Sequence, residues 1–145
     1  IEGAHEGHGL GDRFLGHVER TKILLHLVDG TSETLLKDFK TVRKEMEAYG
    51  GGLAEKPYII GLNKIDAMTP EDVKKKITSL KRSAKVPVYA LSAVAKEGTQ
   101  ELVNALAAVI AEAYAAEGTT APDKASKKRT RDAQALEETD ETGEE

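Results

Sequence analysis

Several residue types and features that define whole classes of protein are missing or scarce in this sequence. The 145 residues include no cysteine and no tryptophan, and aromatic residues make up only 4% of the chain. Without cysteine there is no disulfide framework, and a reducing compartment such as the cytoplasm fits the composition. No apolar run approaches the roughly 18 residues that a membrane-spanning helix requires, so we expect no membrane partner.

An excess of positive charge is also absent. The formal net charge is -4, which gives the chain no built-in surface for nucleic acid, and we expect no DNA partner. Residues 1–116 carry 16 basic and 16 acidic side chains, whereas residues 117–145 carry 5 and 9. The second stretch has almost nothing apolar to bury. We therefore predict one folded domain over residues 1–116 and a disordered, charged tail over residues 117–145.

The rest of the sequence is organised around three short apolar runs, each of which leads into polar residues. They cover residues 23–29, 57–62 and 86–91, and an amphipathic helical pattern follows each of them. Strands that alternate with helices predict an α/β fold with a parallel sheet. Pro87 cannot donate a hydrogen bond to a neighbouring strand, so its strand should lie at the edge. The last helix is expected to bury an apolar stripe that includes Leu102 and Val103.

The polar residues after the central run lie where an α/β sheet would bind a ligand. Ligands of open α/β sheets bind at the carboxyl ends of strands, where Asn63-Lys64-Ile65-Asp66 would lie. A carboxylate such as Asp66 can accept hydrogen bonds from both N1–H and the N2 amino group of guanine, a donor pair that adenine lacks. Sites built on such bonds can reject the wrong ligand by roughly 10⁴-fold. An ordinary polar turn after a strand is the simpler interpretation.

Together, two strand-end sequences resemble the guanine-specificity loops of GTP-binding domains. Asn-Lys-x-Asp at 63–66 is followed, one strand–helix–strand unit later, by Ser-Ala-Val at 92–94. The resemblance implies that Asn63 braces the base and that Lys64 lays its stem over the purine plane. It also implies that the Ala93 N–H meets guanine O6 while Ser92 supports the loop. The predicted guanine-binding residues are Asn63, Lys64, Asp66, Ser92, Ala93 and Val94.

A longer and more specific resemblance lies at the start of the chain. The glycine-rich stretch at residues 3–20 is similar to the switch II segment of the Obg family of bacterial GTPases. The predicted switch II residues are Gly3, Ala4, Gly7, Gly9 and Gly11. The resemblance implies a P-loop NTPase-like (Ras-like) parallel sheet, of which residues 1–116 would form the carboxyl-terminal half of the G domain. It also implies a cytoplasmic GTPase that uses GTP or GDP and Mg²⁺ and is linked to assembly of the large ribosomal subunit.

The phosphate-binding half of such a domain is missing from this sequence. No Gly-x-x-x-x-Gly-Lys-Ser/Thr occurs, and the Asp-x-Pro-Gly that precedes switch II in the family would end before Ile1. The magnesium ligands would lie in that missing part, so we name no catalytic residue and no metal ligand. Together with the absence of an initiator methionine, this leads us to expect a fragment. In the family, the phosphate-loop strand pairs with the strand at 23–28, so we expect an exposed apolar edge and self-association.

Other interpretations of the same residues remain open. The chain could be a non-catalytic module that binds a guanine nucleotide, or one that binds ribosomal RNA through its lysine-rich helix and its tail. For that lysine cluster, a solvated helix face is the simpler interpretation. An unrelated α/β protein with chance motifs is a third possibility. His5, Glu6 and His8 fall one residue short of metalloprotease spacing and are not expected to bind metal, and His26 is expected to be a core histidine with its hydrogen bonds satisfied.

Overall fold

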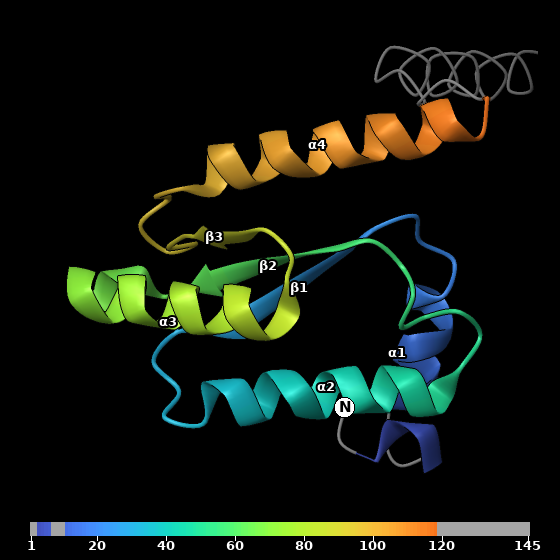
Figure 1. Ribbon diagram of the computed structural model, residues 1–145, viewed down its shortest axis with the longest axis horizontal. Helices are drawn as coiled ribbons and strands as arrows, with labels where there is room; N and C mark the ends of the chain where they lie inside the picture. Colours follow the sequence, from blue (N-terminus) through green and yellow to red (C-terminus); the bar gives the residue numbers. More distant parts are fainter. Residues whose placement is uncertain (1–2, 7–10, 119–145) are drawn as a thin grey trace, which may run out of the picture. The chain divides into compact units, whose positions relative to one another are not determined.

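The computed structural model describes residues 3–6 and 11–118, and in that part the chain is an α/β protein with a three-stranded parallel sheet (Figure 1). The α/β class and the three expected strands are thereby confirmed. The elements in chain order are η1 (Ala4–Glu6), α1 (Gly11–Val18), β1 (Leu24–Asp29), α2 (Leu35–Tyr49), β2 (Tyr58–Asn63), η2 (Ile65–Ala67), α3 (Pro70–Ala84), β3 (Val88–Ala90) and α4 (Thr99–Ala116).

The sheet has the strand order β1-β2-β3, and its register brings the strand ends together. Asp29, the last residue of β1, lies opposite Asn63, the last residue of β2. In the described sheet β3 pairs with β2 alone, which confirms the edge position expected from Pro87. Pro87 contributes only its carbonyl oxygen, which accepts a hydrogen bond from the N–H of Ile60 at 3.1 Å. The loops that follow all three strands therefore open at one edge of the sheet.

Helices α2 and α3 cover one face of the sheet. Their apolar residues recur at helical spacing and pack on all three strands, α2 next to β1 and α3 next to β3, which explains why both segments are helical. Helix α3 begins at a capping hydroxyl followed by a proline: the Thr69 hydroxyl accepts a hydrogen bond from the N–H of Asp72 at 3.2 Å, and Pro70 occupies the first turn. The buried core on this face consists of Val28, Leu35, Phe39, Ile60, Leu62, Leu80 and Val88.

The first turns of α4 cover the other face. Leu102 is buried against Ile59 and Leu91, and Leu106 packs on the same cluster. The expectation that Val103 belongs to this stripe is wrong, because its side chain is 55% exposed. Leu102 and Leu106 are four residues apart and share one side of the helix, whereas Val103 points about 100° away from Leu102.

Strand β1 forms the other edge of the described sheet and leaves apolar surface open. Its residues alternate, so that Val28 faces the core while Leu25 and Leu27 are 36% and 51% exposed. These two leucines lean over Gly61 of β2, where an added Cβ would lie 2.7 Å from a methyl carbon of Leu27. In the described sheet β1 is an edge strand, as expected, and self-association through it stays a prediction.

The chain divides by its internal contacts into two compact units, residues 1–110 and 111–145. The described part of the second unit consists of the end of α4 and the turn that follows, in which the N–H of Gly118 donates to the carbonyl of Ala115. The predicted tail lies, from residue 119 on, outside the described residues. Among the helices that the structure describes, none combines the length and the apolar character needed to cross a membrane.

Candidate functional site

Asn63 connects the loops that follow β2 and β3. Its side-chain oxygen Oδ1 accepts a hydrogen bond from the N–H of Lys64 at 2.9 Å and another from the N–H of Ala93 at 3.1 Å. Ala93 lies 30 residues further along the chain, so this one amide oxygen fixes two loops against each other. Asparagine suits this position because its short, neutral side chain carries an acceptor with two lone pairs.

Asp66 and Ser92 form the second link between the same loops. The hydroxyl Oγ of Ser92 donates to Oδ1 of Asp66 at 2.8 Å and accepts the N–H of Ala95 at 3.0 Å. Ser92 is fully buried, whereas Asp66 is exposed. The described residues place no hydrogen-bond donor on the other carboxylate oxygen, Oδ2. Asp66 is therefore held through one oxygen, and its carboxylate lies at the surface of the protein.

The loop after β3 is closed on itself and held tightly. Ser92 and Glu97 exchange backbone hydrogen bonds at 2.9 and 3.1 Å, so that residues 93–96 form a compact turn. Gly98 ends this turn with a positive φ of 67°, and an added Cβ would lie only 2.3 Å from the carbonyl oxygen of Ala90. A glycine is needed there both for the backbone angle and for the close approach.

Lys64 has a left-handed backbone and reaches across to β1. Its φ of 68° is uncommon for a residue with a side chain. Its ammonium Nζ lies 2.8 Å from Oδ2 of Asp29, and both side chains are about half exposed. The pKa of Asp29 is lowered to about 2, mainly by the hydrogen bond from Lys64 and to a smaller extent by those from Thr31. Sequence reasoning missed Asp29, although it ends an apolar run next to the central strand and so shows the same pattern as Asn63.

The structure brings five of the six predicted guanine-binding residues into one network. Asn63 is hydrogen-bonded to the N–H groups of Lys64 and Ala93, and Asp66 is hydrogen-bonded to Ser92, which directly precedes Ala93 in the chain. Val94 is 89% exposed in the turn and takes part in none of these bonds. The N–H of Ala93 already donates to Asn63, so a guanine O6 would have to share that donor with the asparagine.

The glycine-rich segment does not join this network in the described part of the chain. Gly3 and the turn η1 lie against α1 and α2, and Gly11 begins α1. The predicted residues Gly7 and Gly9, as well as His8, lie outside the described residues. His5 contacts Glu45, which is about ten residues, or about 15 Å, along α2 from its first turn.

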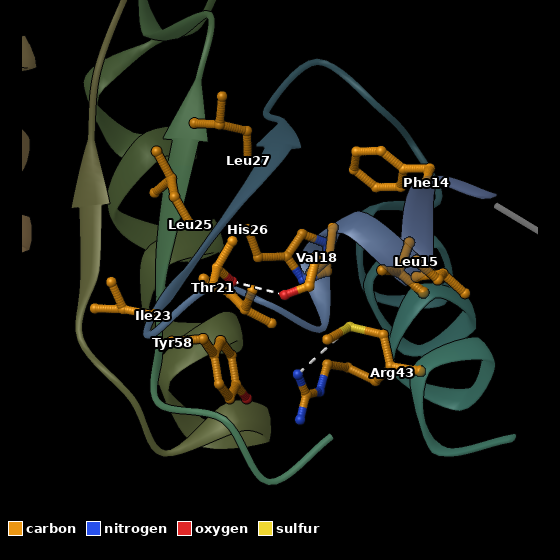
Figure 2. A pocket seen from close by; sticks show the side chains of 13 residues that line it. Phe14, Leu15, Val18, Thr21, Ile23, Leu25, His26, Leu27, Arg43 and Tyr58 are labelled. Atoms are coloured by element: carbon orange, nitrogen blue, oxygen red, sulfur yellow. Dashed lines mark hydrogen bonds between the residues drawn. The ribbon is translucent and has the colours of Figure 1, made fainter. Parts of the chain in front are cut away.

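A separate apolar cavity of about 430 Å³ lies between α1, β1 and α2 (Figure 2). Phe14, Leu25 and His26 are among its lining residues. The expectation of a satisfied core histidine at position 26 is wrong in one respect. Its Nδ1 is buried without a hydrogen-bond partner in the described structure, and burial followed by the nearby charge of Arg43 lowers its pKa to about 4. The ring instead packs on Phe39, with centroids 5.0 Å apart.

The links between the two loops consist of amide, hydroxyl, carboxylate and backbone N–H groups. Among the described residues, no three histidine or acidic side chains gather as metal ligands would. A comparison of the sequence with known protein families found no family that matches.

Proposed function

We propose that this chain carries the guanine-reading part of a GTP-binding domain. The observation that carries the proposal is the pair of links between the two strand-end loops, Asn63 to Ala93 and Asp66 to Ser92. These loops lie at the carboxyl ends of adjacent parallel strands, where open α/β sheets bind ligands. The resemblance of both loops to guanine-specificity motifs supports a P-loop NTPase-like fold for the whole domain.

The geometry of Asp66 supports guanine over adenine. Ser92 fixes Asp66 through Oδ1, which still has acceptor capacity, and Oδ2 is available to a ligand. A carboxylate held in this way can accept two parallel N–H groups, such as N1–H and N2–H of guanine. Adenine offers an unprotonated N1 to the same carboxylate, which would place two acceptors against each other.

The similarity of residues 3–20 to switch II supports the Obg family as the wider assignment. On that basis the parent protein would be a cytoplasmic GTPase that acts in assembly of the large ribosomal subunit. Among the described residues, no three or more acidic or histidine side chains gather as metal ligands, and the sequence has no Gly-x-x-x-x-Gly-Lys-Ser/Thr loop. The proposal for this chain is therefore confined to recognition of the base.

The experiment is a titration of the ¹⁵N-labelled chain with GDP and, separately, with ADP, followed at the backbone amides. We expect GDP to shift the amide signals of Lys64 and Ala93 and ADP to leave them in place at the same concentration. Asp66→Ala removes both acceptor oxygens and should abolish the GDP response. Asp72→Asn serves as the matched control, because Asp72 is an exposed carboxylate in the first turn of α3 outside the network.

Two results would overturn the proposal. Equal responses to GDP and ADP would show that the loops do not discriminate between bases. Loss of the response in Asp72→Asn to the same degree as in Asp66→Ala would show that negative charge alone is responsible.

A further inference from the structure

The loop after β1, residues 29–32, packs directly against the Asn-Lys-x-Asp turn. The N–H of Gly30 donates to the carbonyl oxygen of Asn63 at 2.9 Å. A Cβ added to Gly30 would lie 2.6 Å from that oxygen and 2.5 Å from the sulfur of Met68. Since only glycine permits this approach, the backbones of the two turns are fixed to each other.

The same loop is anchored from its other side by α3. The ammonium of Lys76 donates to the carbonyl oxygen of Gly30 and lies 3.4 Å from that of Ser32. Lys76 belongs to the lysine-rich helix α3, and these contacts give it a structural role. A loop tied on both sides can hold a side chain in one place, which a mobile loop cannot do.

Asp29 is the side chain that this loop holds. Its Oδ1 accepts the N–H of Thr31 at 2.9 Å and the hydroxyl of Thr31 at 2.6 Å. Its Oδ2 faces the ammonium of Lys64 at 2.8 Å. The two oxygens therefore have separate roles, one within the loop and one toward the Asn-Lys-x-Asp turn.

We propose that Asp29 is a positioning residue for base recognition, which holds the Lys64 ammonium at the end of β1 so that the lysine stem lies ordered across the strand ends. This inference rests on the proposed function of the site. A lysine side chain loses much conformational freedom when it is immobilised against a ligand. If the ion pair with Asp29 has already ordered that side chain, this part of the entropic cost no longer opposes binding.

The test compares GDP affinity in the full 145-residue chain and its variants by amide titration. Asp29→Asn keeps the shape of the side chain and an acceptor for Thr31 but removes the charge that holds Lys64. We expect GDP to bind about 3- to 10-fold more weakly, the range that follows from ordering one long side chain. Asp29→Glu restores the charge and should recover part of the loss.

Asp38→Asn is the matched control. Asp38 is an exposed carboxylate that accepts hydrogen bonds from Ser32 and Thr34, next to the same loop, but has no contact with Lys64. It should change the affinity by less than about 1.5-fold. A second readout, the ¹⁵N signal of the Lys64 ammonium, should be protected from exchange in the wild type and in Asp38→Asn and lost in Asp29→Asn.

The possible results separate this inference from the proposed function. If the wild type binds GDP selectively but Asp29→Asn binds it equally well or more tightly, Asp29 does not prepare Lys64 and the inference is overturned while the base site stands. If the wild type shows no selectivity for GDP, the proposed function and this inference are both overturned, whatever the ammonium signal reports.

Discussion

The ring nitrogen Nδ1 of His5 lies 2.5 Å from the carboxylate oxygen Oε2 of Glu45, 40 residues further along the chain. The same oxygen accepts the backbone N–H of His5 at 3.2 Å. Glu45 is only 8% exposed, so this carboxylate depends on the turn η1 for its hydrogen bonds. One buried acidic side chain therefore ties the glycine-rich start of the chain to α2.

This contact should produce a measurable pH dependence. The hydrogen bond to Glu45 raises the pKa of His5 above 6.5, and the same bond, followed by that from Gly3, lowers the pKa of Glu45 to about 2. The contribution to stability is complete between about pH 4.5 and 6.5. It is lost above this window as His5 deprotonates and below it as Glu45 is protonated. Glu45→Gln should return the His5 pKa, measured by NMR, toward 6.5.

Glu47→Gln is the control for this prediction, because Glu47 is an exposed carboxylate two residues away on the same helix. An unchanged His5 pKa in Glu45→Gln would show that the contact does not exist in solution.

His26 should make the protein sensitive to acid. Its pKa is about 4 in the folded chain against 6.5 in the unfolded chain, so the unfolded state binds more protons between these values. Stability is therefore complete above pH 6.5 and falls as the pH decreases toward 4, by about 3 kcal/mol. His26→Phe keeps the ring contact with Phe39 and should remove most of this loss in urea unfolding at pH 7 and pH 4. His17→Phe, at an exposed histidine, should retain it; equal pH dependence in both variants would contradict the account.

Ser92 should contribute stability as well as position. Ser92→Ala removes the hydrogen bond to the Asp66 carboxylate and the acceptor for Ala95, and should cost about 1–2 kcal/mol in the free energy of unfolding. Ser83→Ala, at an exposed position of α3, should change it by less than about 0.5 kcal/mol. A cost for Ser92→Ala no larger than that of its control would mean that the two loops are not joined in solution.

Two glycines with positive φ allow the cost of backbone strain to be measured apart from the cost of steric overlap. Gly50 (φ 78°) has nothing within 4 Å of an added Cβ, whereas at Gly98 (φ 67°) the Cβ would meet the carbonyl of Ala90. Gly50→Ala should therefore cost about 1 kcal/mol. Gly98→Ala should cost about 2–3 kcal/mol more, because backbone atoms must move. Thermal unfolding of both variants measures the difference, and equal costs would refute the close approach at Gly98.

The sequence predicted the strands and the polar loops at their ends, because both are local signals. Apolar runs of residues 23–29 and 57–62 end in polar residues at their strand ends, and the Thr69–Pro70 helix start depends on neighbours in the chain. The pairing of Asp29 with Lys64 and of His5 with Glu45 depends on register and on helix placement. No spacing along the chain encodes those two contacts. Val103 was assigned to the wrong side of α4 because alanines occur all around that helix, which weakens the apolar stripe.

The central claim is that Asp66 reads the base. The most direct test is a substitution that changes which base the site prefers. Asparagine at position 66 would present one donor and one acceptor, which match the carbonyl at C2 and the N1–H of xanthine instead of the two donors of guanine. The wild-type chain and Asp66→Asn are titrated with GDP and with xanthosine diphosphate, at the amide of Ala93. The account predicts that the wild type prefers GDP and the variant prefers the xanthine nucleotide, each by about 10²-fold. A variant that loses GDP binding without gaining the xanthine nucleotide, or a wild type that binds both equally, would contradict it.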